Sequence, residues 1–310
     1  MKITDAIIGN VNQGSKLSVQ DIERLVNDTI QNPETLDYVD GATTLSYLKS
    51  NKVIFLDSLN DERLSILENT ENSQSLFILP KGNYKNINVA YIQTNEPRII
   101  FAKIISAIFD YFESYYDGYY SQDELSYAFP ETKIFPGCQI HRTAKIGKGS
   151  ILMPNVFIGP HCVIGDRALV SPNTTIGQAG FGVIAQDNLE HIHIPHVGGV
   201  WIGDNVEIGA LNSVASGTIH PTIIESHVKM DSAVHIAHNC YISKGALITA
   251  HVEISGSTHV GKGVWIGPNT SIINGVKIGD GAFIGIGTNV TKSIPENVRA
   301  IGNPVKILKN

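Results

Sequence analysis

The stretch that decides the fold is MDSAVHIAHNCYISKGALITAHVEISGSTHVGKGVWIG, residues 230–267. An aliphatic residue or methionine recurs at every sixth position of this stretch, from Met230 to Ile266. Neither the 3.6-residue period of an α-helix nor the two-residue alternation of a strand generates that spacing. A six-residue repeat is typical of a parallel β-helix, in which each hexad forms one short strand and one corner. The sequence therefore predicts a mainly β fold.

The same register extends well beyond this stretch. It is kept by Ile134, Ile140, Ile146, Leu152, Ile158, Ile164, Val170 and Ile176, then by Ile202, Ile208 and Val214, and from Ile224 to Val290. Three hexads make one triangular coil of 18 residues, and the aliphatic residues of successive coils stack into a continuous core. We predict a left-handed parallel β-helix over residues 134–292.

The fourth position after each aliphatic residue also turns inward near a corner, so it should hold a small residue. Cys138, Cys162 and Cys240 all occupy it. The three cysteines are therefore interpreted as core residues rather than as a catalytic nucleophile. An odd number of cysteines in a chain of this length does not indicate a disulfide framework, which favours a reducing, cytoplasmic setting.

Two interruptions break the repeat. Residues 178–200, QAGFGVIAQDNLEHIHIPHVGGV, are too many for a corner and are predicted to protrude as a loop. A smaller excursion is expected at His220–Pro221. Loops that leave a rigid scaffold often carry binding residues.

The first 120 residues have a different pattern, which predicts a separate mixed α/β domain. Short strands are expected within 51–59 and 73–80, and a helix should start at Pro97. Residues 121–133 are interpreted as a linker and 293–310 as a C-terminal cap. The four tyrosines of YYDGYY (115–120) are suited either to stacking on a base or to packing against the first coil.

The composition excludes several kinds of partner. The formal net charge is −6 with 17% charged residues, and no basic stripe suited to nucleic acid is present. No apolar run approaches the length of about 18 residues that a membrane span needs. The first residues, MKITDAIIGN, lack the layout of a secretory signal.

His238 lies two positions after Ile236, at a corner, and should point outward. Gly256 follows 18 residues later and should stack one coil away, about 4.8 Å along the ladder. A histidine base beside a backbone N–H suits acyl transfer, because one takes a proton and the other stabilises an oxyanion. Asp231 is a candidate to orient the imidazole. The alternative is that the histidines simply occupy tolerant surface corners.

A zinc site is the other chemistry that clustered histidines suggest. The three-histidine zinc site of the gamma-class carbonic anhydrases has two histidines five residues apart and the third two coils earlier. Only His191 and His196 have the five-residue spacing, and no partner lies 36 residues before them. We therefore expect no metal.

Three segments resemble one family. GFG (180–182), IPHVGGVWIGDNVEIGA (194–210) and MDSAVHIAHNC (230–240) are similar in order and spacing to the UDP-3-O-(3-hydroxyacyl)glucosamine N-acyltransferases of lipid A synthesis. HIAHNC also resembles the HIAHDC-like run of the UDP-N-acetylglucosamine O-acyltransferases. The resemblance implies that His238 is the general base, Gly256 the oxyanion donor and Asp231 the partner of the histidine. It implies substrate contacts from the following residues: His235, Asn239, Phe181 and Gly182.

Departures from that family shape the rest of the prediction. SVASGT (213–218) lacks the Asp and Arg of the family's sugar-contacting stretch. The ending RAIGNPVKIL resembles the tail of sugar acetyltransferases that use coenzyme A, so the donor is expected to be acyl-CoA. The expected contacts to this co-substrate are Asn274, Asn303, Pro304 and Lys306.

The function expected from these resemblances is N-acylation of a nucleotide-linked amino sugar, such as a dTDP-amino-dideoxyhexose for a surface glycan. The active form is expected to be a homotrimer with clefts between chains. Two alternatives stay open at this point. One is a lipid A N-acyltransferase that uses acyl carrier protein, and the other is a non-catalytic trimeric scaffold.

Overall fold

The computed structural model describes residues 14–70, 73–109 and 118–308. Its described part divides into two compact units. One unit holds residues 118–181 and 196–308, and the other holds residues 14–109 together with 182–195. Within these described ranges, no helix combines the length and the apolar character that crossing a membrane requires.

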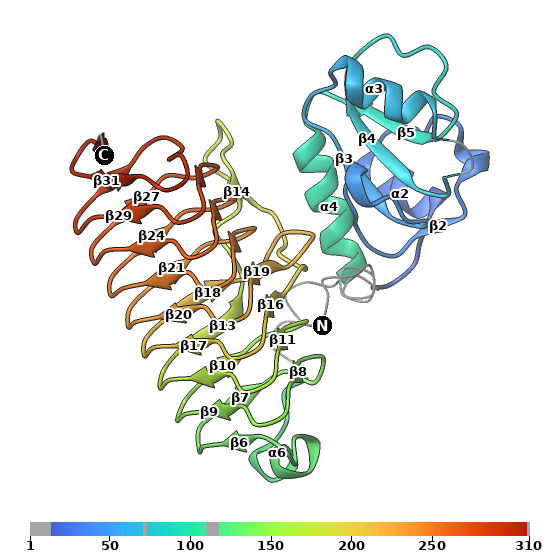
Figure 1. Ribbon diagram of the computed structural model, residues 1–310. Helices are drawn as coiled ribbons and strands as arrows, with labels where there is room; N and C mark the ends of the chain where they lie inside the picture. Colours follow the sequence, from blue (N-terminus) through green and yellow to red (C-terminus); the bar gives the residue numbers. More distant parts are fainter. Residues whose placement is uncertain (1–13, 71–72, 110–117, 309–310) are drawn as a thin grey trace. The chain divides into compact units, whose positions relative to one another are not determined.

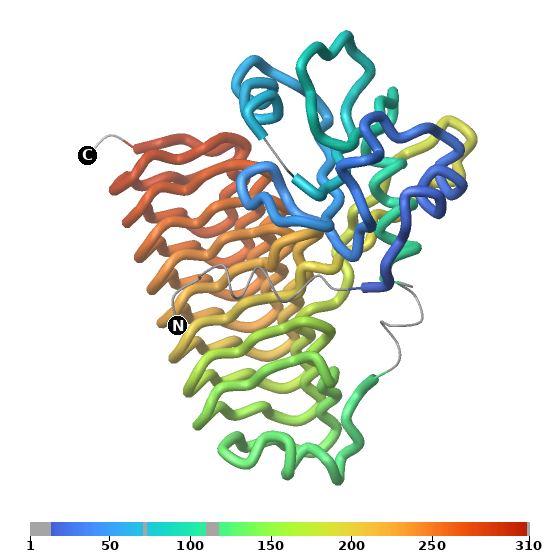
Figure 2. Tube along the Cα trace, turned by 90° about the vertical axis from the view of Figure 1, so that its right-hand side faces the viewer, coloured from blue at the N-terminus to red at the C-terminus, as the bar shows by residue number. Residues whose placement is uncertain are grey.

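The first unit is the predicted parallel β-helix, with short strands stacked coil upon coil (Figures 1 and 2). Its first sheet consists of β7 (Gln139–Ile140), β10 (Phe157–Ile158), β13 (Thr175–Gln178), β18 (Ser213–Ala215), β21 (His235–Ile236), β24 (Glu253–Ile254), β27 (Ser271–Ile272) and β30 (Asn289–Val290). The second sheet consists of β8 (Lys145–Ile146), β11 (Val163–Ile164), β16 (Val200–Ile202), β19 (Thr222–Ile224), β22 (Tyr241–Ile242), β25 (His259–Val260) and β28 (Lys277–Ile278).

The third sheet runs along the remaining side of the coils. Its strands are β6 (Lys133–Ile134), β9 (Ile151–Leu152), β12 (Leu169–Val170), β17 (Glu207–Ile208), β20 (Lys229–Met230), β23 (Leu247–Ile248), β26 (Trp265–Ile266), β29 (Phe283–Ile284), β31 (Arg299–Ile301) and β32 (Lys306–Leu308). All pairs are parallel except β31 with β32. Ile236 is in register with Ile254, and Ile254 with Ile272, which confirms the 18-residue coil.

The core is the predicted ladder of aliphatic side chains. Ile236, Ile254 and Ile272 are fully buried, and the small residues at the fourth position are buried as well. Cys138, Cys162 and Cys240 are among them, which confirms their interpretation as core residues.

Both ends of the β-helix carry more regular structure than the sequence suggested. The segment 121–133, interpreted as a linker, contains α6 (Gln122–Ala128), whose Leu125 is 3% exposed and belongs to the β-helix core. A helix forms there because an uncovered first coil would leave its aliphatic side chains in water. At the other end, β31 pairs with β29, so the third sheet continues into residues 293–310.

The loop predicted at 178–200 is partly regular. Val183–Ile184 (β14) and Ile192–His193 (β15) form an antiparallel hairpin. Residues 182–195 group with the N-terminal unit, where β15 contacts α4 (Pro97–Phe109). The hairpin is therefore part of a packed unit.

The second unit is the predicted α/β domain. Its sheet is parallel, with the order β3 (Val53–Phe55), β4 (Leu76–Pro80) and β5 (Ala90–Thr94). The other elements are β1 (Leu17–Ser18), α2 (Val19–Val26), β2 (Tyr38–Val39), α3 (Asp61–Glu68), α4 and two 3₁₀ turns, η1 (Pro33–Thr35) and η2 (Leu45–Tyr47). The helix expected from Pro97 is α4.

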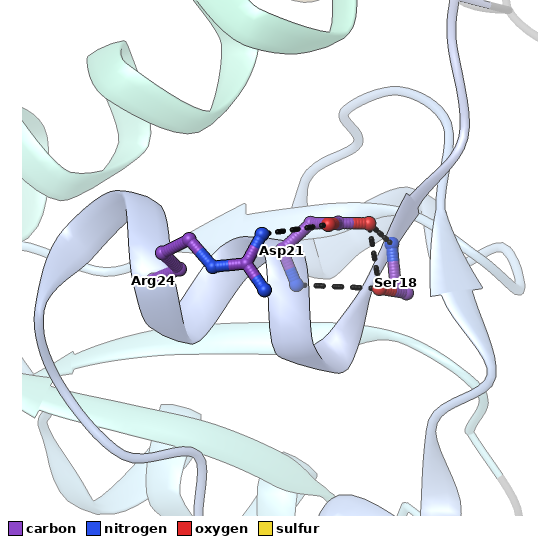
Figure 3. A network of polar contacts seen from close by, with 3 residues as sticks. All are labelled: Ser18, Asp21 and Arg24. Atoms are coloured by element: carbon purple, nitrogen blue, oxygen red, sulfur yellow. Dashed lines mark hydrogen bonds and ion pairs between the residues drawn. The ribbon is translucent and has the colours of Figure 1, made fainter.

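Helix α2 begins with a capping box, which explains where it starts (Figure 3). The Asp21 N–H donates to Ser18 Oγ, and the carboxylate of Asp21 accepts from the Ser18 N–H and hydroxyl. These bonds lower the pKa of Asp21.

Two of the four tyrosines can be placed. Tyr120 packs against the β-helix core and Tyr119 against Phe157, as the packing interpretation predicted. Tyr115 and Tyr116 lie outside the described residues.

Candidate active site

The imidazole of His238 lies against the backbone of Gly256, as the 18-residue spacing predicts. His238 follows β21 at the corner between the first and second sheets, and Gly256 follows β24 one coil away (Figure 1). A Cβ placed on Gly256 would be 2.8 Å from Cε1 and 2.9 Å from Nε2 of the ring. Only a residue without a side chain allows this approach.

The amide of Gly256 has no hydrogen-bond acceptor among the residues that the structure describes. The equivalent corner amides of Lys148 and Lys262 donate to Asp166 and Asp280. No carboxylate of the described chain serves Gly256 in this way, so its N–H remains available beside the imidazole. This is the arrangement that stabilisation of an oxyanion requires.

His238 is held by its neighbour in the sequence. Asn239 Nδ2 is 2.9 Å from His238 Nδ1 and 3.0 Å from the hydroxyl of Thr218. Asn239 Oδ1 accepts the Thr218 N–H at 2.8 Å. Burial, and secondarily the nearby His235, lower the pKa of His238. The ring is therefore neutral at neutral pH, as a proton acceptor must be.

His196 and Gly180 complete the surroundings of the ring. The His196 ring is 3% exposed and meets the His238 ring edge-on, with centroids 5.1 Å apart. A Cβ on Gly180 would be 2.9 Å from His238 Cβ. The sequence did not predict that His196, Gly180 or Thr218 would lie near His238. Their positions depend on the backbone path of the two segments that interrupt the repeat.

Two predicted substrate residues lie next to His238 in the chain. His235 is half-buried on β21, with Nδ1 3.3 Å from Ser213 Oγ. Ser213 in turn accepts a hydrogen bond from the amide of Gln178. The side-chain amide of Asn239 contacts Thr218 and His238, and its contact with substrate stays a prediction.

Phe181 and Gly182 have different settings. Phe181 belongs to the β-helix unit and is 88% exposed, while the Gly182 carbonyl accepts from Ile194 N–H within the second unit. Their contact with substrate stays a prediction.

Asp231 follows β20 of the third sheet, whereas His238 follows β21 of the first. The Asp231 carboxylate accepts the N–H of Ser232. A seven-residue separation is one hexad plus one residue, so the two side chains belong to different corners. The structure shows no hydrogen bond between these two described residues, and their predicted pairing stays a prediction.

A shallow cavity of about 290 Å³ lies on the first sheet, starting one coil beyond His238. Its lining is Glu253, Ser255, Ser271, Ile272, Ile273, Asn289, Val290 and Thr291. The turn at 302–305 closes over the last of these coils, since Asn289 N–H donates to the Gly302 carbonyl and Val305 N–H to the Asn289 carbonyl.

The four residues predicted to contact the co-substrate do not belong to the lining of this cavity. Asn303 and Pro304 lie in that turn, Lys306 begins β32 of the third sheet, and Asn274 occupies the corner above Gly256, so their contact with a co-substrate stays a prediction. All four are exposed.

The thiol of Cys240 is buried in the core of the β-helix. Burial raises the pKa of Cys240 to about 12, and the same cause raises the pKa of Cys162 to about 12. A thiol with such a pKa is not a nucleophile near neutral pH. Within HIAHNC, His238 therefore remains the candidate for a reactive group.

Comparison with known proteins agrees with the hexapeptide repeat. The model of bacterial transferase hexapeptide (six repeats) matches residues 143–178 and 257–292. The chain is 44% identical over 103 residues to a UDP-3-O-acylglucosamine N-acyltransferase of Herminiimonas arsenicoxydans, covering 33% of this chain and 29% of that protein. It is 39% identical over 119 residues to the protein of that name in Hydrogenovibrio crunogenus, covering 38% and 34%. The chain thus matches about a third of the length of these relatives.

Solved structures support the fold. The UDP-N-acetylglucosamine acyltransferase of Francisella novicida superposes with a TM-score of 0.51 at 22% identity, covering 57% of this chain and 66% of that one. The enzyme of the same name from Campylobacter jejuni gives 0.50 at 24% identity, covering 58% and 73%. The chain is therefore a hexapeptide-repeat β-helix protein that resembles the UDP-3-O-acylglucosamine N-acyltransferases.

Proposed function

We propose that the protein is an N-acyltransferase that moves an acyl group from a pantetheine thioester to the amino group of a nucleotide-linked amino sugar. The observation that carries the proposal is the neutral imidazole of His238 lying against Gly256, whose N–H has no acceptor in the described chain. Together they offer a proton acceptor and an oxyanion donor at one corner.

The reaction follows from these two groups. The amine attacks the thioester carbonyl carbon, a C–N bond forms, and the electron pair of the C=O bond moves to oxygen, where the Gly256 N–H donates to it. The C–S bond then breaks, and the carbonyl is restored. The proton that the nitrogen loses passes to His238 and on to the departing thiolate. One donor of this kind is worth about 2.7–4 kcal/mol of barrier.

The acceptor is best matched by a UDP-linked 3-O-acylglucosamine. The relatives found are named for that substrate, which favours the lipid A alternative over the dTDP-amino-dideoxyhexose expected from the chain's departures. For the donor, the lining of the cavity beyond His238 combines polar side chains such as Ser255, Ser271 and Asn289 with aliphatic ones, which suits the amides and methylenes of a pantetheine arm. We propose acyl-CoA as the donor, with acyl carrier protein thioesters as the alternative.

We further propose that the working form is a homotrimer. Because His238 is half-buried at a corner of one β-helix, a neighbouring β-helix would supply the opposite wall of the cleft. A chromatographic measurement of mass in solution tests this part separately.

The test is a mass-spectrometric transfer assay. Purified protein is incubated with acyl-CoAs or acyl carrier protein thioesters of several chain lengths, and with UDP- and dTDP-linked amino sugars. An acylated UDP sugar is expected. Acylation of the dTDP-linked sugars alone would support the dTDP-amino-dideoxyhexose acceptor expected from the sequence. No acylation with any combination of donor and acceptor would favour a non-catalytic scaffold.

A further inference from the structure

Glu253 brings a carboxylate to the same segment that contacts the ring of His238. It lies on β24 ahead of the buried Ile254, so its side chain points out of the first sheet, as does that of Ser255. The Ser255 hydroxyl donates to both carboxylate oxygens, at 3.0 and 3.3 Å. Ser255 directly precedes Gly256, against which the His238 ring lies. The carboxylate and the imidazole therefore contact two consecutive residues.

This carboxylate is level with the proposed reaction centre. Glu253 is in register with His235 of the previous coil and with Ser271 of the next. It is half-buried and forms part of the lining of the cavity that starts one coil beyond His238. The rest of the lining lies farther from His238, along β27 and β30. Glu253 is thus at the end of the cavity where the acceptor must meet the thioester.

The carboxylate of Glu253 has capacity for a further hydrogen-bond donor. An ionised carboxylate accepts about four hydrogen bonds and donates none. Within the ranges that the structure describes, Glu253 forms no ion pair and accepts only from the hydroxyl of Ser255. Burial is the main cause that raises the pKa of Cys240, and the charge of Glu253 adds to it. The carboxylate therefore acts on the corner that carries His238.

A primary amine needs two acceptors to attack in a single orientation. It has two hydrogens and one lone pair, and the lone pair must face the thioester carbon. If His238 accepts one hydrogen and Glu253 the other, the lone pair is directed at the carbon whose oxygen the Gly256 N–H holds. Positive charge develops on the nitrogen as the C–N bond forms, and a carboxylate beside it stabilises that charge. His238 then takes one proton, and the other hydrogen stays on the amide.

We propose that Glu253 binds the amino group of the acceptor and selects an amine over a hydroxyl. This inference rests on the proposed acyl transfer and names the group that recognises its nucleophile. A hydroxyl has one hydrogen, so it can donate to His238 or to Glu253 but not to both. When that hydrogen is given to His238, the oxygen lone pairs face the carboxylate, and an acceptor that faces an acceptor costs free energy.

The experiment compares two acceptors that differ in one group. One is a UDP-linked 3-O-acylglucosamine, and the other is the UDP-linked 3-O-acylglucose that carries a hydroxyl in place of the amine. Calorimetry on the full-length protein gives Kd for each sugar, and the transfer assay gives kcat/KM. We expect the unmodified protein to prefer the amine, and Glu253→Ala to lose about 10–100-fold of that preference, the factor that a hydrogen bond to a charged group corresponds to.

Two further variants separate recognition from folding. Glu253→Ser should lose the preference as well, and it suits the fold because Ser213 and Ser271 occupy outward positions of the same sheet. Glu207→Ala is the matched control, since Glu207 precedes the buried Ile208 at the same repeat position on the third sheet. It should keep the preference of the unmodified protein.

An amine preference that is absent from the unmodified protein, or unchanged in Glu253→Ala, would overturn the proposal. The ratio of kcat/KM decides where turnover occurs, and the ratio of Kd decides where it does not. The proposed function fails in a different way, through the absence of acylation by the unmodified protein with either sugar.

Discussion

The ring of His238 and the backbone of Gly256 are separated by 18 residues of sequence and by one coil of the β-helix, and the ring occupies the space in which a Cβ at position 256 would lie, 2.8 Å from Cε1. The contact depends on the absence of a side chain at position 256. It brings the imidazole of His238, a candidate proton acceptor, next to the Gly256 N–H, which donates to no group of the described chain. Neither residue could supply both groups alone.

Replacing Gly256 with Ala should separate these groups. The added methyl would meet the ring at 2.8–2.9 Å and displace it. A misplacement of about 1 Å is enough to cost about 100-fold in rate, so kcat should fall by about that factor. Steady-state kinetics measures it. Folding should be unaffected, because Ala210 and Ala250 occupy the same repeat position. A Gly256→Ala protein with unchanged kcat would remove Gly256 from the site.

Leu125 should stabilise the first coil of the β-helix. Its side chain on α6 is 3% exposed and lies in the core. Truncating a buried leucine costs about 2–5 kcal/mol, so Leu125→Ala should lower the free energy of unfolding by that amount. Urea denaturation followed by circular dichroism measures it. Tyr127→Ala is the control on the same helix, since Tyr127 is 87% exposed. Equal losses in both variants would contradict a capping role for α6.

The stability of the β-helix should decline between about pH 6.5 and pH 4 because of His161. Burial, with a smaller effect of His141, lowers the pKa of His161 to about 4. The unfolded chain binds this proton at about pH 6.5, so acidification through that window favours unfolding, by on the order of 3 kcal/mol. Below about pH 4 both states are protonated and the contribution is constant.

The exchange His161→Asn tests this pH dependence. Asparagine suits the backbone at φ 58° and has no proton to bind, so the melting temperature should vary less between pH 6.5 and 4. His251→Asn is the control, because His251 is exposed and also has a positive φ, 57°. Glu124, whose pKa is lowered to about 2 by its bonds with Arg142 and Ser121, acts at lower pH. If the melting temperature of His161→Asn changed with pH as much as that of the unmodified protein, His161 would not be the cause of the pH dependence.

The hexapeptide repeat and the contact between His238 and Gly256 could be predicted because both follow from the number of residues per coil. A six-residue period places Ile236 under Ile254 and His238 beside Gly256, whatever the rest of the chain does. The same counting places Asp231 after a strand of the third sheet and His238 after a strand of the first, so the pairing of these two residues rests on the resemblance alone and stays a prediction.

The parts of the site that escaped prediction depend on irregular backbone. His196 and Gly180 reach His238 only because of the path taken at either end of the 178–200 interruption. Thr218 reaches Asn239 through the smaller excursion before β19. No period governs these segments, and their backbone is fixed by tertiary contacts. The helix α6 escaped for a related reason, since seven residues of polar helix carry little periodic signal.

The most direct test of the account compares His238→Gln with the unmodified protein in the transfer assay, using a UDP-linked 3-O-acylglucosamine and the thioester that supports turnover. Glutamine keeps a polar side chain at the corner but cannot take up a proton, and general base catalysis is worth about 10²–10⁴-fold. We predict that the rate of amide formation falls by that factor, while binding of the UDP sugar, measured by calorimetry, and the oligomeric mass remain the same. A His238→Gln protein that forms the amide at the unmodified rate would contradict the account.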